Sequence, residues 1–136
     1  MMPPPPRITS SPPSPLIERG AFQRDLGELK LRLWAARALA LERNREAWRR
    51  VTVGERLDNR MQAELRAAAT FATDVALDVV LQAYRYAGGS VVYKPNILER
   101  ALRDLQTASQ HLMVSSSAYE ILGEALLGVS GIQPLS

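Results

Sequence analysis

The sequence predicts an all-α protein, a four-helix up-and-down bundle preceded by a disordered, proline-rich N-terminus. Aromatic residues make up 6% of the 136 residues, whereas alanine and leucine are abundant, which favours packed helices over a sheet. Apolar residues also recur at steps of three and four along most of the chain, which is the period of an α-helix. A chain of this length forms one domain with a buried core.

Residues 1–16 read MMPPPPRITSSPPSPL and contain most of the nine prolines. They have no apolar periodicity, so we predict a disordered or polyproline-like leader, followed by a helical domain over residues 17–136. The leader has neither the apolar region of a secretory signal nor the amphipathic helix of a mitochondrial presequence. The chain also has no cysteine, which suits a reducing compartment, and we expect a cytoplasmic protein.

The first helix is predicted from Phe22 to about Arg50. Its apolar positions alternate in steps of four and three, except that the turn at Arg43 has a charged residue where an apolar one is expected. These positions are Phe22, Leu26, Leu29, Leu33, Ala36, Ala40 and Ala47. Arg43 lies within the densest basic cluster of the chain.

That cluster bears on the choice of partner, because the chain has a net charge of +3. Its 17 basic residues are interleaved with 14 acidic ones, and Glu42 and Glu46 lie among the clustered arginines. We interpret the cluster as a solvated helix face and expect no nucleic-acid partner. The clustered arginines are Arg43, Arg45, Arg49 and Arg50.

The second helix is predicted from Glu55 to about Tyr86, with Thr52 and Glu55 as a capping box. After Ala67 its apolar character extends almost all round the helix, more than three other helices can readily cover. We therefore expect self-association into a homo-oligomer. The period is kept by Leu57, Met61, Leu65, Ala68, Ala72, Val75 and Val79.

A polar stripe runs along this second helix at Thr70, Asp74, Asp78 and Gln82. The two aspartates share a face, but no histidine or third carboxylate has matching spacing, so we expect no metal site. We interpret them as a solvated or interface stripe. They also interrupt the longest apolar run, so no membrane span is expected.

The third helix is predicted to begin at Ile97, after a capping box of Asn96 and Glu99. At about 100° per residue, four polar residues fall within roughly a 60° stripe: Arg100, Asp104, Thr107 and His111. Leu98, Ala101, Leu105, Ala108 and Leu112 cover a separate, core-forming face.

Residues 115–117 are predicted to end this helix. Ser117 and Glu120 form a third capping box for a short helix to about Leu127, with Gly128 as its C′ residue.

The second helix ends in Gly88 and Gly89, which gives this segment two readings. Glycine terminates a helix in a left-handed conformation without steric cost. Two residues without Cβ also let backbone N–H groups approach a phosphate closely. Both readings stay open on the residues alone.

The glycine pair, the linker, the string ERALRD, a histidine seven residues past its aspartate and the closing AYEILGEALLG carry a family resemblance. From about Phe22 to Gly128 the chain resembles the C-terminal helical domain of the acyl-CoA dehydrogenase superfamily. It is most similar to the branch of flavin-dependent monooxygenases that hydroxylate aromatic or sulfur compounds.

The resemblance implies an oxidoreductase that uses FMN or FAD on a small aromatic or heteroaromatic substrate. It implies that His111 transfers a proton, as a group with a pKa near neutrality can. Gly88 and Gly89 are implied to contact the flavin nucleotide, although Arg85 stands where the dehydrogenases carry a glutamine. Arg100 would meet a flavin phosphate or an acidic partner.

Other residues are given structural roles. Arg103 and Asp104 match the family's Arg-Asp pair, and we interpret them as tying helices together. Trp34 and Trp48 are interpreted as core or interface anchors rather than flavin-stacking groups. Residues 110–113 contain no carboxylate, which disfavours α-proton abstraction from an acyl-CoA.

In the family, a preceding helical domain and a β-domain supply most of the flavin pocket. We therefore expect that the isolated chain is a partial site that retains no flavin, and that it works as a homo-oligomer or with a relative carrying the missing domains. The alternative is a non-catalytic helical oligomerisation module that docks onto such a relative.

Overall fold

The computed structural model describes residues 2, 14–88, 96–110 and 115–129. It contains a 3₁₀ turn, η1 (Leu16–Glu18), and four helices: α1 (Gly20–Thr52), α2 (Asn59–Ala87), α3 (Ile97–Ser109) and α4 (Ser117–Leu127). No strand occurs in these described ranges. The predicted all-α fold with four helices is confirmed.

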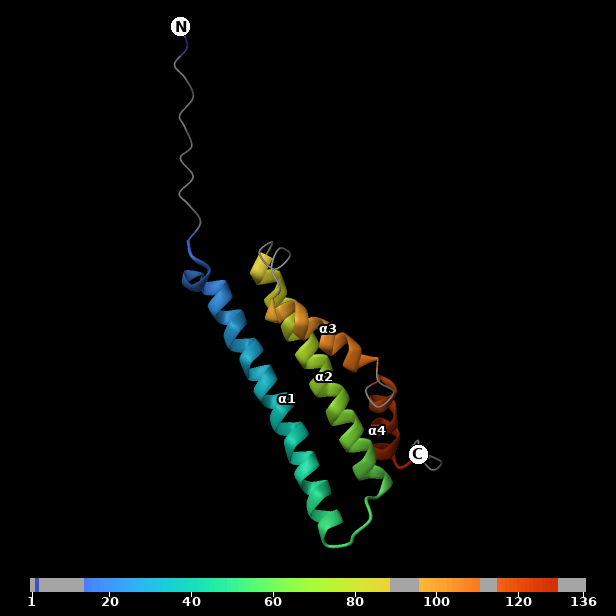
Figure 1. Ribbon diagram of the computed structural model, residues 1–136. Helices are drawn as coiled ribbons and strands as arrows, with labels where there is room; N and C mark the ends of the chain where they lie inside the picture. Colours follow the sequence, from blue (N-terminus) through green and yellow to red (C-terminus); the bar gives the residue numbers. More distant parts are fainter. Residues whose placement is uncertain (1, 3–13, 89–95, 111–114, 130–136) are drawn as a thin grey trace.

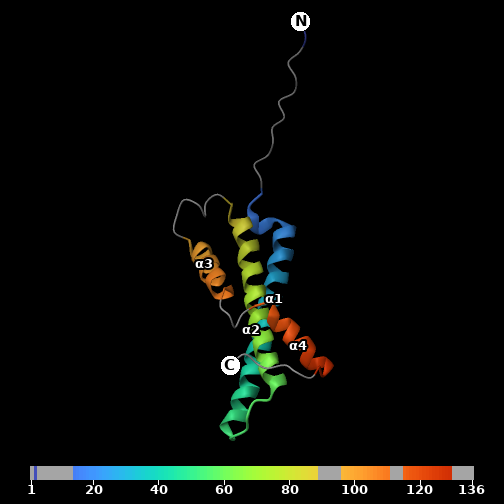
Figure 2. The ribbon, with the colours of Figure 1, turned by 90° about the vertical axis from the view of Figure 1, so that its right-hand side faces the viewer.

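Helix α2 is the centre of the fold. Helices α1 and α2 form a long antiparallel pair, and α3 and α4 pack against α2 at different levels (Figure 1). Figure 2 shows α3 beside the C-terminal half of α2 and α4 beside its N-terminal half. Three helices thus contact α2, while α1 lies at the edge of the molecule.

The core is built largely from small side chains. Alanine supplies most of the buried positions, which lets helix backbones approach closely where α1 and α4 meet α2. Helix α3 contributes half-buried positions at the predicted Leu98, Ala101 and Leu105, whereas the predicted Ala108 is exposed. The buried apolar residues are Leu29, Ala36, Ala47, Met61, Ala63, Ala67, Ala68, Val75 and Ala118.

Two predicted capping boxes are wrong. Helix α1 continues to Thr52, whose hydroxyl donates to the Trp48 carbonyl oxygen at 2.8 Å. Helix α2 begins later than predicted because Asp58 caps it, accepting a hydrogen bond from the Met61 N–H at 2.7 Å. At α4, Ser117 is already the first helical residue, and Ser116 precedes it without a side-chain cap.

The predicted start of α3 and the predicted end of α4 are confirmed. Asn96 caps α3 by accepting a hydrogen bond from the Leu98 N–H at 2.9 Å. Glu99 does not reach back to complete the box, because it accepts a bond from Arg103 at 3.2 Å instead. Gly128 ends α4 with φ of 68°, in the left-handed region that glycine favours.

The tryptophans do not belong to the core of this chain. Trp34 and Trp48 are 57% and 75% exposed on α1, so the core interpretation is wrong, and their role as interface anchors stays a prediction.

The expectation of self-association depends on uncovered apolar surface on α2, and the structure shows less of it than expected. Within residues 67–81 of α2, the exposed large apolar side chains are Phe71 and Leu81, because three helices cover much of this segment. The larger uncovered apolar surface lies on α1.

Candidate functional site

The C-terminal end of α2 carries the first predicted site residue. Gly88 has φ of 61° and ψ of −153°, a conformation that residues with a Cβ rarely adopt. It therefore ends α2 as predicted, while Gly89 lies outside the described residues. The exposed carbonyl groups of a helix C-terminus carry partial negative charge, which disfavours a phosphate there unless a cation offsets it. Arg85, exposed in the last turn of α2, is such a cation.

A cluster of aromatic and acidic side chains joins the N-terminal end of α1 to the C-terminal end of α2. The Tyr86 hydroxyl donates to the Asp25 carboxylate, and the Tyr86 ring meets Phe22 edge-on with centroids 5.0 Å apart. Tyr86 and Arg24 lower the pKa of Asp25 by hydrogen bonding to its ionised form. A shallow hollow lined by Asp25, Gln82, Arg85 and Tyr86 lies here. The cluster fixes the helix ends that present Gly88.

Helix α3 carries Arg100, the second predicted cofactor residue within the described part. Its side chain is 85% exposed and lies 3.9 Å from Asp104, one turn along the same helix. Arg103 bonds to Glu99 and is 74% exposed. The interpretation that Arg103 and Asp104 tie helices together is therefore wrong, because both pair along α3. The exposed guanidinium groups remain accessible to an anion.

The structure does not bring Arg100 and Gly88 into one hollow. The depression at Arg100 is lined by residues from α3 and its cap alone: Asn96, Ile97, Glu99, Arg100, Arg103 and Asp104. His111, the predicted proton-transfer residue, lies outside the described residues. Among the described side chains, no group of three carboxylates or imidazoles is placed to hold a metal ion.

These residues fit the charged edge of a flavin nucleotide. Arg100 ends the first turn of α3, where the helix dipole favours a phosphate, and Arg103 lies one turn further along. A hollow lined by one helix cannot enclose a tricyclic ring, which needs walls on several sides. The described part therefore offers a phosphate contact and not a complete flavin pocket.

The polar stripe of α2 joins helices. Asp74 accepts a hydrogen bond from the Tyr119 hydroxyl of α4 at 2.6 Å, and Asp78 forms an ion pair of 2.6 Å with Arg32 of α1. The Thr70 hydroxyl is buried and donates to the Ser115 carbonyl oxygen at 3.4 Å. Of the two readings of the stripe, the interface reading is confirmed, with the interface lying inside the chain.

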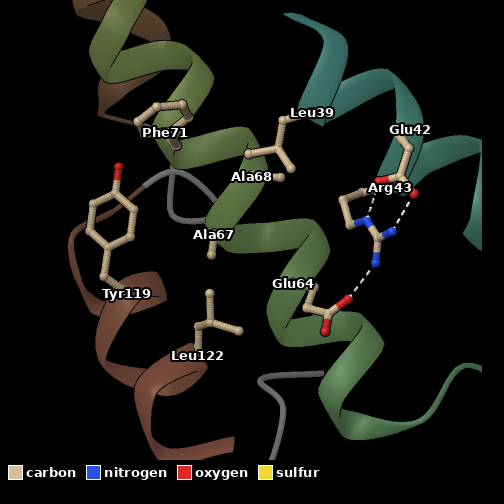
Figure 3. A pocket seen from close by; sticks show the side chains of 9 residues that line it. All are labelled: Leu39, Glu42, Arg43, Glu64, Ala67, Ala68, Phe71, Tyr119 and Leu122. Carbon is tan, nitrogen blue, oxygen red and sulfur yellow. Dashed lines mark hydrogen bonds and ion pairs between the residues drawn. The ribbon is translucent and has the colours of Figure 1, made fainter. Parts of the chain in front are cut away.

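A groove between α1, α2 and α4 was not predicted from the sequence (Figure 3). It has a volume of about 410 Å³. Ala67 and Ala68 form its floor, and apolar side chains from the three helices form its walls. One end is closed by Arg43, which bonds to Glu42 on α1 and to Glu64 on α2. The wall residues are Leu39, Phe71, Tyr119 and Leu122.

The groove suits binding better than acid–base chemistry. Glu42 and Glu64 raise the pKa of Arg43, which keeps its guanidinium charged. Desolvation and the hydrogen bond to Asp74 raise the pKa of Tyr119 to about 12. Neither group exchanges a proton readily near neutral pH. The groove therefore presents an apolar, partly aromatic surface without a poised base.

A signal for this groove was present in the sequence. The apolar period of α1 misses one turn at Arg43, and in the structure that side chain points toward α2, where Glu64 accepts its hydrogen bond at 2.8 Å. A charged residue at a core-facing position indicates a partner across the interface. The basic-cluster interpretation, a solvated face, is therefore wrong for Arg43.

The comparison with protein families identifies the fold. The profile of the acyl-CoA dehydrogenase C-terminal domain matches residues 6–116. The match covers most of the chain, and the chain belongs to this family. A search of curated proteins finds no match. No helix in the described part is both long and apolar enough to cross a membrane.

Proposed function

We propose that this chain is the C-terminal helical domain, or a fragment, of a flavin-dependent oxidoreductase, and that the complete enzyme is a monooxygenase acting on a small aromatic or heteroaromatic substrate. Family membership over residues 6–116 is the observation that supports this most directly. Acyl-CoA dehydrogenases generally bind FAD, and FMN is the alternative flavin. The proposed compartment is the cytoplasm.

In this proposal the chain supplies one wall of the flavin site. Arg100 and Arg103 hold a nucleotide phosphate at the N-terminal end of α3. Gly88 lies outside that hollow, so with Gly89 it would contact a different part of the nucleotide through its backbone. Bound flavin would supply the redox chemistry of the reaction. His111 holds or moves a proton near the substrate.

The cover over the flavin ring must come from elsewhere. The described hollows do not enclose a flavin ring, so a partner has to cover it, either a second copy or a relative that carries the missing helical and β-domains. We expect that the isolated chain retains no flavin on purification. A yellow preparation with stoichiometric flavin would contradict this partial-site proposal.

The catalytic test uses an assembly of this chain with such a relative. His111→Ala should lower product formation by about 100-fold or more, the usual effect of losing a positioned general base. Arg100→Ala should weaken flavin binding, measured by fluorescence titration, whereas Arg37→Ala on α1 should not. Full turnover by the His111→Ala assembly would remove the catalytic assignment.

The alternative is a non-catalytic module that assembles helical proteins. The exposure of Trp34 and Trp48 on α1 favours it, because large exposed apolar side chains are typical of interaction surfaces. If the chain is such a module, His111→Ala should not change product formation and Arg100→Ala should not change flavin binding. The same two variants therefore separate the two functions.

A further inference from the structure

Two polar side chains are buried within the residues that the structure describes, and both belong to α2. They are Arg66, which is 8% exposed, and Thr70, which is 1% exposed. Because they are four residues apart in a helix, they lie on the same face, with about 5–6 Å between their Cβ atoms. An arginine is almost never buried to this extent unless it is paired, because burial removes the hydration of its charge. The position of Arg66 therefore calls for an anion.

The guanidinium of Arg66 has unpaired donors. Its Nε and Nη1 atoms are buried, and the described residues offer them no hydrogen-bond partner. A guanidinium has two edges that can each bind an anion, and Nη2 belongs to both, so each edge contains one of these unpaired atoms. By contrast, the half-buried Arg43 donates to Glu42 and to Glu64. The more deeply buried arginine is thus the one without a carboxylate in the described part.

The acidic side chains of this chain do not pair with Arg66. All 14 aspartates and glutamates lie within the described residues, and none of their ion pairs includes Arg66. The positions three and four residues away along α2 carry no acid, which excludes an ion pair within the helix. An anion that pairs with this guanidinium therefore comes from outside the acidic side chains of the chain. The four helical neighbours are Gln62, Ala63, Ala69 and Thr70.

We propose that Arg66 binds a small carboxylate molecule at a buried position on α2. A carboxylate is planar and presents two oxygen atoms, which match the paired N–H groups of a guanidinium edge. One guanidinium neutralises one negative charge, so a carboxylate leaves less net charge buried than a phosphate dianion does. The site involves neither Arg100 nor Gly88, and it therefore stands apart from the oxidoreductase proposal.

The side chains next to Arg66 on α2 indicate the size of the carboxylate. Ala63 and Ala67 are 3% and 4% exposed, and both are small and apolar. Buried methyl groups favour contact with another apolar group rather than with a second charge. A short aliphatic carboxylate combines one negative charge with a few apolar carbon atoms, and this is the class of ligand that the surroundings of Arg66 favour.

Thr70 provides a second donor on the same face of α2. Its hydroxyl donates to the Ser115 carbonyl oxygen at 3.4 Å, which is long for a hydrogen bond between two oxygen atoms. A hydroxyl hydrogen rotates to suit its acceptor, so this group can donate instead to a carboxylate bound by Arg66. Since Ser115 lies just before α4, the site is next to the contact between α2 and the start of α4.

Binding at Arg66 is coupled to stability. A buried guanidinium without a partner lowers the stability of the folded chain, and a bound carboxylate removes that cost. A ligand that binds the folded chain and not the unfolded chain stabilises it in proportion to the logarithm of ligand concentration once the site is largely occupied. Unfolding in the presence and absence of a simple carboxylate therefore tests the site without knowledge of the natural ligand.

The first experiment measures the urea midpoint of the full chain in Tris chloride while sodium acetate replaces sodium chloride at constant ionic strength. The midpoint of the wild type should rise with acetate concentration. The midpoint of Arg66→Met should not depend on acetate. The matched control Arg37→Met removes an exposed arginine from α1 and should respond to acetate as the wild type does. Circular dichroism checks that each variant remains helical.

The second experiment measures acetate affinity by isothermal titration calorimetry. Thr70→Val removes the hydroxyl and keeps the branched shape, and it should weaken binding about tenfold, as expected for one hydrogen bond to a charged group. Arg66→Lys keeps the charge and loses the paired N–H groups, so it should weaken binding by a similar factor of about ten. This variant also tests the site if Arg66→Met does not remain helical.

Three results would overturn the proposal. The first is a wild-type midpoint that does not change when acetate replaces chloride. The second is acetate binding that survives both Arg66→Met and Arg66→Lys, since the anion would then lie elsewhere, for example at Arg100. The third is binding of inorganic phosphate that depends on Arg66 and is tighter than that of acetate, which would make the ligand a phosphate.

Discussion

Arg43 of α1 donates a hydrogen bond of 2.8 Å to Glu64 of α2 and so joins the two long helices at one end of the groove. The two side chains are 26% and 20% exposed, and solvent screens this pair less than it screens a surface pair. Glu42 accepts from the same guanidinium, while Arg60 donates to Glu64 at 3.1 Å. Arg43 is therefore the cation that links carboxylates on both helices.

We expect that Arg43→Ala lowers the free energy of unfolding by about 1 kcal/mol, the upper part of the range for partly screened ion pairs. Urea denaturation measures the change, and a double-mutant cycle with Glu64→Gln isolates the coupling between the two side chains. The control Arg100→Ala removes an exposed pair on α3 and should change stability by less than about 0.5 kcal/mol. A coupling near zero would show that packing alone joins α1 to α2 here.

How far the sequence predicts this structure depends on whether a feature is local. The helices of α1, α2 and α3 follow from apolar period, and the Asn96 cap follows from a side chain acting two residues away. The end of α1 could not be predicted as well, because Thr52 has two options. It can cap a following helix or bond to Trp48 within its own helix, and the structure contains the second.

The candidate site depends on tertiary packing and is less predictable. A period along one helix does not say which of two apolar faces meets α2, so the sequence assigns Trp34 and Trp48 to the core as readily as to an interface. The groove arises from three helices and no single stretch of sequence specifies it. The only local feature of the sequence that indicates the groove is the charged Arg43 within the apolar period of α1.

The backbone at Gly88 provides a second test. Gly88→Ala should lower the free energy of unfolding by about 1 kcal/mol or more, because φ of 61° is strained for alanine. The control is Gly123→Ala, within α4, where a Cβ meets no atom within 4 Å and alanine should stabilise the helix by about 0.5–1 kcal/mol. Thermal unfolding of both variants measures the difference. Equal effects at the two glycines would mean that Gly88 imposes no special backbone conformation in solution.

Arg66 of α2 gives a third prediction. It is 8% exposed, and the described residues offer its Nε and Nη1 atoms no hydrogen-bond partner. Unpaired buried donors lower stability by about 1–3 kcal/mol, so Arg66→Met, which keeps much of the side-chain length, should raise the midpoint of urea unfolding. Arg66→Lys keeps a buried cation and should bring no such gain. Destabilisation by Arg66→Met would indicate that the guanidinium has an anionic partner in solution.

The hydrogen bond from Tyr119 to Asp74 predicts how stability depends on alkaline pH. Burial and this bond raise the pKa of Tyr119 to about 12, above the ordinary value of about 10 that applies in the unfolded chain. The unfolded chain therefore loses this proton first as pH rises. The stabilisation that Tyr119 contributes is complete below about pH 10 and is lost as pH rises to about 12.

Tyr119→Phe tests this linkage because it removes the ionising hydroxyl and keeps the ring against the groove. The variant should be less stable at pH 7 by about 1 kcal/mol, and its stability should fall less steeply than that of the wild type between about pH 10 and 12. Urea unfolding at several pH values measures both effects, and ultraviolet titration of the folded wild type follows ionisation directly. Tyr84→Phe serves as the control, since it removes a tyrosine hydroxyl from α2 and leaves the hydrogen bond from Tyr119 to Asp74 in place. If the two variants have the same pH dependence, Tyr119 does not anchor α4 to α2 through Asp74.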